Sequence, residues 1–515
     1  MSMRFKSLAV LCLAGWISLQ GFVVSADDGN IVSDVKARAA GLTVQWFTQL
    51  SNSHGEIVSS EVVVDENDST TYFELSGGGL KQIISDRDIS PAGQVFGVEG
   101  AESFAKLRQE IMQAELDFHE IGEKIEIERY SIPKITVFAM TSNGIVHCID
   151  GESGEMRWKT EIGKRSFPSV GMGANKNYVA AVNGSRVYCM EADTGKVIFE
   201  HQCREAVLSA PAVGDEYVFV PLANGALQAL PIKSKAFGNS PLNAVGSATT
   251  PPIVAGNIVA WTTDAGYIVV SDRKNMKSMK YRIRGAGEFA ASPAASNDRL
   301  FAATLNGFVY AIDDLNGAVM WNFSLGERVT NAPVPFGDYL FIVTDEHHLY
   351  KFDGKTGDVA AGWEIPIEGI TGIVGASAER LYLKDLVGNI VVVDRVSGQR
   401  MGQVDSGSNF ASMVNDKTDR IYICTKSGLV QCMREVDRER PMFHADFVEV
   451  VAAEQPETIK KADEPEASDN PFGGKKAEPK SDSSNPFKTN NDNSDGGNPF
   501  KTGGGNDDGN PFKGG

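Results

Sequence analysis

The chain has 515 residues, with 53 glycines, 9% aromatic residues and a formal net charge of −18 at pH 7. This length suits two or three ordinary domains, or one large repeat fold with appendages. A chain this acidic repels phosphate backbones and anionic lipid surfaces, so its charge argues against nucleic acid as a partner.

The first residues resemble a secretory signal. Arg4 and Lys6 precede an apolar stretch, and Val24-Ser25-Ala26 fits the small-residue rule for cleavage. We therefore expect residues 1–26 to be removed as a signal peptide; an uncleaved anchor helix is the alternative. No later stretch approaches the roughly 20 apolar residues that a membrane span needs. The sequence thus predicts an exported protein without a transmembrane span after cleavage.

Residues 27–98 are predicted to be a β segment that completes the repeat fold described below. VQWFTQL resembles a fourth strand of a repeat, and TYFELSGGGLKQIIS resembles two strands joined by a turn. The final repeat, SGLVQCMRE, lacks an obvious fourth strand of its own. We expect the strand around Trp46 to pair with it, because closing a ring removes the exposed strand edges that promote aggregation.

Residues 99–123 are expected to form a helical insertion. Apolar residues recur there at alternating steps of three and four, which places them on one stripe of a helix. The stripe consists of Phe104, Leu107, Ile111, Ala114, Phe118 and Ile121. It either docks on the flank of the repeat fold or binds a partner, as in a coiled coil.

A constant period organises residues 124–445. The turn position recurs every 40 or 41 residues, at Gly144, Gly184, Gly225, Gly266, Gly307, His347, Gly388 and Gly428. Each unit contains signals for four strands: a proline opens the first, a glycine turn precedes the third, and a D-x-x-[STN]-G turn leads to the fourth. Four strands with a period near 40 to 45 residues are typical of a β-propeller. We predict an all-β, eight-bladed propeller, with nine blades as the alternative.

The turn before each fourth strand carries residues that we predict to be structural. The aspartate can accept backbone N–H bonds, the glycine can adopt a positive φ, and the following aromatic residue can wedge between neighbouring units. These residues are Asp150, Gly154, Trp158, Asp313, Gly317, Trp321, Asp353, Gly357, Trp363, Asp394 and Gly398.

The segments YAIDDLNGAVMW and HCIDGESGEMRW follow the pattern A-x-D-x-x-[ST]-G-x-x-x-W. This pattern resembles the PQQ-type repeat, and the resemblance covers roughly Ile135 to Arg434. It implies the eight-bladed propeller of the quinoprotein dehydrogenases and of non-enzymatic, BamB-like propeller proteins of outer-membrane assembly. Because such a fold hosts many functions, the resemblance implies the fold more strongly than an activity.

The dehydrogenase branch would imply PQQ held against a disulfide between adjacent cysteines, with a bound Ca²⁺ ion. The chain has no Cys-Cys pair; Cys148, Cys189 and Cys432 stand where other units carry alanine, so we interpret them as core thiols. His347-His348 replaces an Asn-Gly turn, and consecutive strand side chains point to opposite faces. A turn variant is therefore favoured over a metal site. We predict no enzyme activity, no cofactor and no metal.

Residues 446–515 change character. They are rich in Gly, Asn, Asp, Ser, Lys and Pro, cannot bury a core, and are expected to be disordered. An Asn-Pro-Phe (NPF) triplet recurs there; Asn before Pro favours a tight turn that would hold the Phe outward. Four weak contacts gain avidity, and a tail without a receptor is the alternative. The candidate partner-binding residues are Asn470, Pro471, Phe472, Asn485, Pro486, Phe487, Asn498, Pro499, Phe500, Asn510, Pro511 and Phe512.

These observations favour an exported bacterial β-propeller of the periplasm or cell envelope that acts as a scaffold or protein-binding protein. Its partners are expected to be envelope proteins, and the NPF tail would act as a multivalent recruiting motif. The alternatives are a quinoprotein-like oxidoreductase that uses PQQ in the central channel, and a ligand-binding sensor.

Overall fold

The computed structural model describes residues 31–50, 55–91, 93–234, 241–296, 298–406 and 410–444. These residues form eight antiparallel sheets and two helices, α1 Asp34–Ala39 and α2 Gly97–Phe118. Neither of these helices combines the length and apolarity that a membrane crossing requires. The predicted signal peptide (1–26) and the predicted tail (446–515) lie outside the described residues.

Five sheets follow the same plan, with four strands paired in chain order. Their strands are β7 Ser169–Ala174, β8 Tyr178–Asn183, β9 Arg186–Glu191, β10 Val197–Gln202; β14 Ile253–Ala255, β15 Ile258–Thr262, β16 Tyr267–Asp272, β17 Met279–Arg284; β18 Ala294–Ser296, β19 Arg299–Ala303, β20 Phe308–Asp313, β21 Val319–Ser324; β22 Val334–Phe336, β23 Tyr339–Val343, β24 His348–Asp353, β25 Ile367–Glu368; and β26 Ile370–Ala376, β27 Arg380–Asp385, β28 Ile390–Asp394, β29 Arg400–Val404.

Three sheets depart from this plan. One has three strands, where the repeat predicts four: β11 Ala212–Val213, β12 Tyr217–Pro221 and β13 Leu227–Pro231; residues 235–240, which follow it, lie outside the described part of the chain. Another has five, in the order β3-β2-β4-β5-β6: β2 Ile57–Gly77, β3 Leu80–Ser85, β4 Glu126–Thr141, β5 Ile145–Asp150 and β6 Met156–Glu161. The third joins the two ends of the described chain: β1 Leu42–Gln49, β30 Phe410–Met413, β31 Ile421–Thr425 and β32 Leu429–Glu435.

The second and third strands of the repeat sheets lie in continuous core. Ile258–Thr262 is buried at every position, because both faces of its sheet are covered by neighbouring sheets. The fourth strands alternate instead, as in Val319–Ser324, since one face is open to water. Continuous hydrophobic runs in the sequence therefore mark the inner strands, and alternation of hydrophobic and polar residues marks the outer strands.

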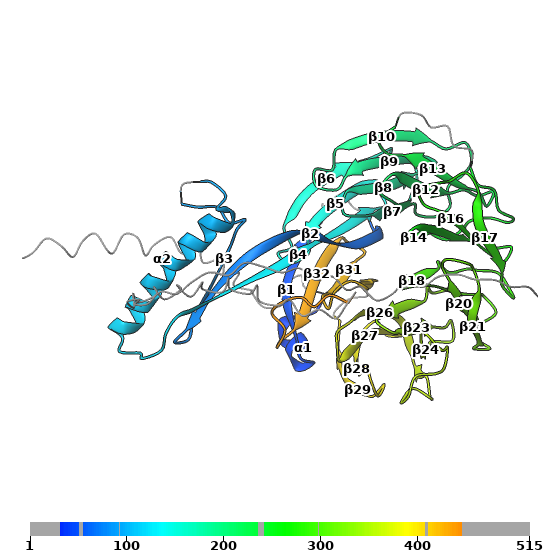
Figure 1. Ribbon diagram of the computed structural model, residues 1–515. Coiled ribbons are helices and arrows are strands. Elements are labelled where there is room, and N and C mark those ends of the chain that lie inside the picture. Colours follow the sequence, from blue (N-terminus) through cyan, green and yellow to red (C-terminus); the bar gives the residue numbers. More distant parts are fainter. Residues whose placement is uncertain are drawn as a thin grey trace, which may run out of the picture. The chain divides into compact units, whose positions relative to one another are not determined.

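The eight sheets close into a ring. One cluster of buried apolar side chains lies between each sheet and the next, and eight such clusters link the sheets in a closed circle. Phe219 and Trp261, for example, share the cluster between the β11–β13 and β14–β17 sheets. Figure 1 shows the sheets following one another in chain order, from cyan through green and yellow to orange. The fold is the all-β propeller that the repeat predicts.

The N-terminal strand completes the last sheet. β1 pairs antiparallel with β32, from Leu42 opposite Glu435 to Gln49 opposite Leu429. The strand around Trp46 thus takes the place that the sequence predicted for it. Just before α1, the backbone N–H groups of Ile31 and Val32 donate to Gln431 Oε1, which fixes this end of the chain against β32.

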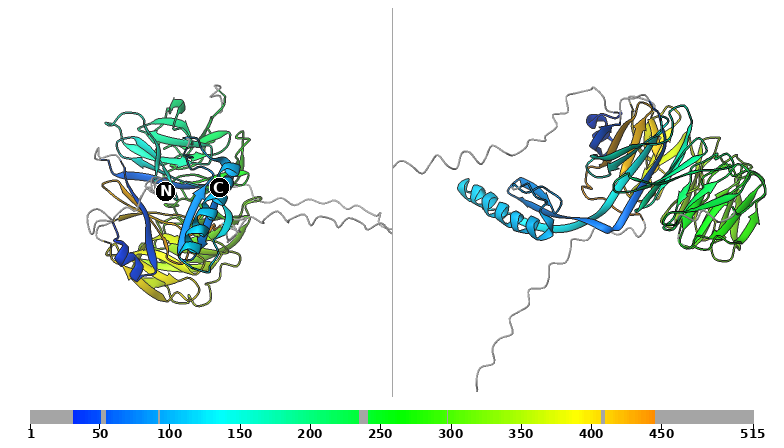
Figure 2. Two further views of the ribbon diagram at one scale, coloured as in Figure 1. Left: turned by 90° about the vertical axis from the view of Figure 1, so that its left-hand side faces the viewer. Right: turned by 90° about the horizontal axis from the view of Figure 1, so that it is seen from above.

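An extension, which we call the arm (residues 69–133), leaves the propeller from the five-stranded sheet. Residues 57–65 of β2 pair with residues 134–141 of β4 inside the ring, and after a bulge residues 69–76 pair with residues 126–133 in the arm. β3 and α2 complete the arm, which lies at the left of Figure 1 and is seen from above in Figure 2. Residues 69–98 therefore belong to the arm, although residues 27–98 were predicted to complete the propeller.

The helix begins at Gly97 and ends at Phe118, close to the predicted insertion 99–123. It packs on the arm strands, where Ala101, Ala105, Met112 and Leu116 form a small core with Phe73, Leu75, Ile84 and Ile125. The alternative in which the apolar stripe docks on the propeller flank is thus wrong, because residues on another side of the helix meet the arm strands. Of the stripe, Phe104 packs against this small core.

Candidate functional site

The predicted turn residues adopt one repeated geometry. Asp313 Oδ1 accepts hydrogen bonds from the backbone N–H groups of Leu315 (2.9 Å) and Asn316 (3.0 Å), and Gly317 has a φ of 76°. The turns at Asp150, Asp353 and Asp394 repeat these bonds, with positive φ at Gly154, Gly357 and Gly398. The aspartate carboxylate thus accepts hydrogen bonds from backbone N–H groups within the turn.

Four tryptophans each connect one sheet to the next. Trp321 of β21 donates its indole N–H to Gly354 O at 3.1 Å, and its ring covers Gly357 so closely that a Cβ there would lie 2.5 Å away. The tryptophan therefore pairs with the glycine of the following turn, and not with Gly317 of its own unit. Trp46 and Trp158 cover Gly154 and Gly195 in the same way, and Trp363 lies farther from Gly398, at 3.3 Å from a Cβ placed there.

The seam between the last and the first sheet carries an additional ion pair. The Arg420 side chain is fully buried, and it donates from Nε and Nη2 to the two carboxylate oxygens of Glu152, both at 3.0 Å. Trp46 donates to Gly151 O at 2.9 Å beside it. Sequence reasoning missed the ion pair, since its members lie 268 residues apart and outside the repeat pattern.

The segment after β32 ties the ring to the base of the arm. Arg420 Nη2 also donates to Glu439 O at 2.8 Å. Arg440 binds the carboxylate of Glu128 through both terminal nitrogens, and Lys81 forms an ion pair with Glu439. The described chain then ends at His444, whose Nε2 lies 2.7 Å from Ala376 O of β26.

Three charged groups interact where the first strands of the first and last sheets, β2 and β30, contact each other: Glu61 of β2, and Asp416 and Lys417, which follow β30. Glu61 of β2 retains contact with solvent, yet the surrounding protein desolvates it and raises its pKa to about 7. Asp416 raises this pKa further, and Lys417 opposes the rise. A carboxylate that titrates near neutral pH thus lies at the inner side of the ring.

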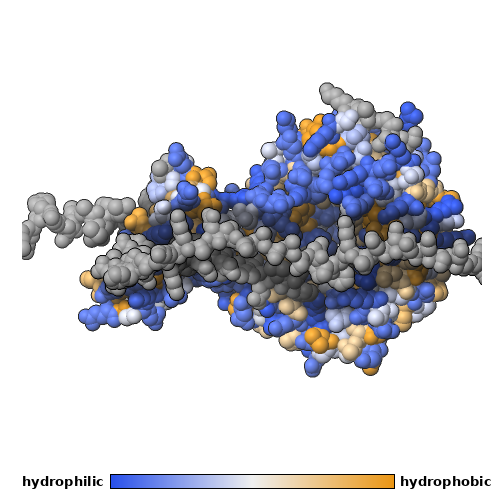
Figure 3. Space-filling view, viewed as in Figure 1, coloured by the Kyte–Doolittle hydropathy of each residue, from blue (hydrophilic) through white to orange (hydrophobic). Residues whose placement is uncertain are grey.

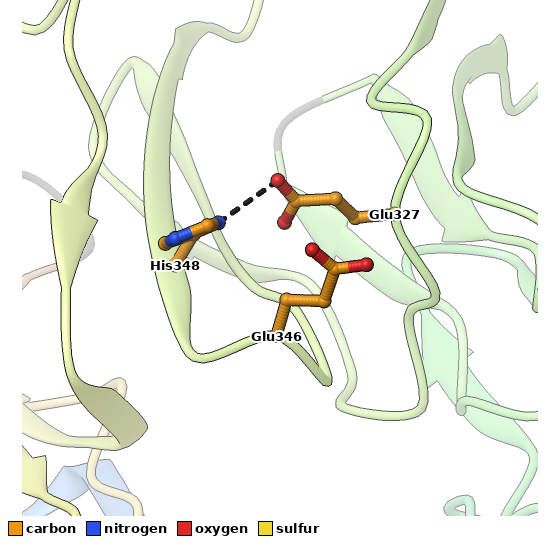
Figure 4. Close-up of side chains that lie close together, drawn as sticks. All are labelled: Glu327, Glu346 and His348. Carbon is orange, nitrogen blue, oxygen red and sulfur yellow. Dashed lines mark hydrogen bonds and ion pairs between the residues drawn. The ribbon is translucent and has the colours of Figure 1, made fainter.

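One cluster could offer ligands to a metal. Potential ligand atoms of Glu327, Glu346 and His348 lie within 4.8 Å of one another. Figure 4 shows these three side chains close together. His348 Nδ1 lies 2.8 Å from Glu327 Oε1, which also accepts from the Tyr350 hydroxyl at 2.9 Å. Burial alone would raise the pKa of Glu327, but its hydrogen bonds lower it below the usual value. The Glu327 carboxylate is thus satisfied by protein donors, and the cluster joins two neighbouring sheets without needing an ion.

The two histidines have separate roles, as the turn interpretation requires. His347 adopts a φ of 67° at the position where other units carry glycine, and only His348 belongs to the cluster. The cysteines Cys148, Cys189, Cys203, Cys424 and Cys432 are unpaired and buried. Desolvation raises the pKa of Cys148 to about 12, which suits a core thiol. The twelve NPF residues from Asn470 to Phe512 lie outside the described residues.

The propeller matches one protein family. Residues 142–234 and 259–453, more than half of the chain, match the PQQ-type family described as outer membrane protein assembly factor BamB. The arm lies outside these ranges.

Curated relatives carry the name of that family. The BamB of Shewanella oneidensis is 25% identical over 328 residues, covering 57% of this chain and 80% of the relative. The BamB of Yersinia pestis is 25% identical over 326 residues, covering 57% and 81%. The BamB of Moranella endobia is 26% identical over 256 residues, so the chain spans just under two thirds (64%) of that relative. The crystal structure of BamB from Moraxella catarrhalis superposes with a TM-score of 0.48 at 17% identity, covering 59% of this chain and 92% of that one.

Proposed function

The chain belongs to the PQQ-type family described as outer membrane protein assembly factor BamB, and we propose that it is a protein-binding scaffold for assembling outer-membrane proteins in a bacterial envelope. The family match over more than half of the chain carries this proposal. A closed ring supports it physically, because each sheet is held by two neighbours and the whole forms a stiff platform with solvent-facing loops and fourth strands.

Depletion of the protein in its own organism tests this role. We expect the amounts of folded outer-membrane proteins to fall, and a copy of the intact gene to restore them. A copy carrying a surface substitution such as Val387→Glu, at a valine that is 83% exposed, serves as the matched control. Unchanged outer-membrane protein levels in fully depleted cells would contradict the proposed role.

Binding is proposed in place of catalysis, since the relatives are named as assembly factors. Incubation of the purified protein with PQQ and Ca²⁺ tests this point directly. We expect neither stoichiometric binding nor dye-linked alcohol oxidation; either result would favour the oxidoreductase alternative.

Export is part of the proposal and has its own test. The motif Val24-Ser25-Ala26 favours cleavage after Ala26. Mass spectrometry of the protein from the native envelope is expected to find Asp27 as the N-terminus. Recovery of the protein only from the cytosol, with Met1 intact, would contradict export.

The NPF tail is proposed to recruit a second partner through four repeated contacts. Four weak sites on one chain act at high effective concentration, so losing all four phenylalanines should remove the recruitment while leaving the propeller folded. The test compares proteins captured from the envelope by the intact chain and by a variant with Phe472, Phe487, Phe500 and Phe512 changed to alanine. Identical sets of captured proteins would contradict this role of the tail.

A further inference from the structure

Helix α2 has two apolar faces, and the arm covers one of them. Ala101, Ala105, Met112 and Leu116 are buried against the strands. Polar contacts fix this orientation: Gln109 Nε2 donates to Ile125 O at 2.6 Å, and Gln113 Oε1 accepts from Ile125 N at 2.9 Å. The helix therefore cannot turn its other face to the arm without breaking these bonds.

The second face is exposed. Leu107, Ile111 and Phe118 expose 51%, 47% and 82% of their surface, with Ala114 between them. Apolar surface is visible on the arm in Figure 3, at the left of the view. Large exposed apolar side chains in one contiguous row mark an interaction surface. We call this row, Leu107, Ile111, Ala114 and Phe118, the seam face.

The spacing of the seam face selects the shape of its partner. Its members follow one another at steps of 4, 3 and 4 residues, as Leu107, Ile111, Ala114 and Phe118 show. This is the a/d pattern along which a second α-helix packs side by side in a coiled coil. An extended strand would contact every second residue and cannot follow such a row.

The charges beside the seam face select the chemistry of the partner. Glu110, Glu115 and Asp117 flank it, at the positions that face the edges of a partner helix. Arg108 is the basic residue at these flanking positions; it donates to the neutral Gln82 at 3.0 Å and keeps its charge. Lys106 lies away from the flanks and pairs with Glu102. Three acidic groups against one basic group leave the flanks net acidic, so a partner with basic flanks complements them.

A second copy of this chain fits less well. In a parallel pair, Glu110 of one helix would face Glu115 of the other. In an antiparallel pair, Glu110 would face Asp117, and the attraction between Arg108 and Glu115 would only offset that repulsion. Neither arrangement gains net charge attraction, whereas a partner with basic flanks does. The NPF tail supplies lysine after three of its four triplets, but the triplets are 12 to 15 residues apart and contain proline, so they cannot form a continuous helical row.

We propose that the seam face of α2 docks one amphipathic α-helix of another protein, whose apolar stripe is flanked by lysine or arginine. The arm presents this helix on strands that extend beyond the propeller sheet, and both lie outside the residues that match the family. The interaction is therefore an addition to the proposed scaffold role and does not depend on it.

A pair of designed helical peptides tests the chemistry. Both carry leucine at the a and d positions; one has lysine at the flanking e and g positions and the other has glutamate. We expect the full chain to bind the lysine peptide at least about tenfold more tightly, and Ile111→Glu with Phe118→Glu to weaken this binding by at least about tenfold. Val387→Glu, at a valine of the propeller that is 83% exposed, should leave binding unchanged. Equal binding of both peptides, or no effect of the double substitution, would overturn the proposal.

A photo-crosslinker at position 111 in native cells identifies the natural occupant. Position 387 carries the same crosslinker in the control strain. We expect crosslinks only at position 111, mapped by mass spectrometry to a segment with an apolar helical stripe and basic flanks. Crosslinks to a second copy of this chain, to its own tail, to a segment without this pattern, or to nothing would overturn the assignment. Substitutions in the seam face lie outside the propeller and should leave it folded. A negative result for helix binding can therefore be distinguished from a negative result in the depletion test of the assembly role.

Discussion

Neutralising Glu152 should loosen the ring at the seam where its first and last sheets meet. Glu152 is the bidentate partner of Arg420, whose side chain has no solvent exposure. Glu152→Gln leaves a buried guanidinium without its main counter-ion, which typically costs about 3–5 kcal/mol. Asp419 lies 3.4 Å from Arg420 and retains part of the compensation, so we place the loss near the lower end, at about 3 kcal/mol.

Removing the cation as well should recover part of this loss. In the triple variant Glu152→Gln, Asp419→Asn, Arg420→Met no charge of this buried cluster is left unpaired, and the remaining cost is that of lost hydrogen bonds, about 1–2 kcal/mol. The control is Asp338→Asn, which removes an exposed ion pair with Lys355 (3.4 Å) and should cost at most about 1 kcal/mol.

Urea unfolding at pH 8, followed by tryptophan fluorescence, measures these differences from the transition midpoints. Asp419, whose pKa burial raises to about 6 against the opposing effect of Arg420, is ionised at this pH in the wild type. The order of stability should be wild type, triple variant, Glu152→Gln. A triple variant that is no more stable than Glu152→Gln would refute the account of Arg420 as a buried charge that requires Glu152.

Three further predictions follow from the structure. Gly357→Ala should destabilise the protein by about 2–4 kcal/mol, because an alanine there has a positive φ and its Cβ overlaps Trp321. The control Gly326→Ala has a φ of 75° and no neighbour within 4 Å, so it should cost only the backbone strain of about 1–2 kcal/mol. Equal losses of stability in the two variants would contradict the tryptophan contact. Desolvation by the surrounding protein raises the folded-state pKa of the exposed Glu61 from 4.5 to about 7. This group therefore favours folding when protonated, and its contribution is lost as pH rises from about 4.5 to 7. The thermal midpoint of Glu61→Gln should exceed that of wild type increasingly between pH 5 and 8, and a constant difference would exclude this titration. The five described cysteines should resist a thiol reagent until the protein is unfolded, because they are buried and their pKa values are raised; rapid reaction of a native thiol among them would contradict the packing.

The repeat made most of the propeller predictable. A period of 40 or 41 residues and the Asp and Gly of each turn depend on local backbone chemistry, which a single unit already shows. The strand around Trp46 was predictable because the last unit lacked a fourth strand. Even the replacement of glycine by His347 followed from its phase in the repeat, and the structure shows the positive φ that this requires.

The arm and the seam ion pair were not predictable in the same way. Both faces of α2 carry apolar residues. The periodicity of the sequence indicated the row of larger residues as the packed face, but the arm strands bury the other face, with Ala101, Ala105, Met112 and Leu116. Which face docks depends on the contacting strands, and these contacts are not local. Glu152 and Arg420 belong to no repeated position, so only the closed ring brings them together.

The pairing of β1 with β32 also affects the order in which the protein can fold. Ile31 contacts Gln431, 400 residues later in the chain. At typical synthesis rates of 5–20 residues per second, about 20–80 s separate the appearance of the two ends. Until then the N-terminal strand has no partner, and the last sheet lacks its outer strand. A chain truncated before β32 would leave its N-terminal strand unpaired, so ring closure can act as a test of complete synthesis, and incomplete products would expose an apolar strand to proteases.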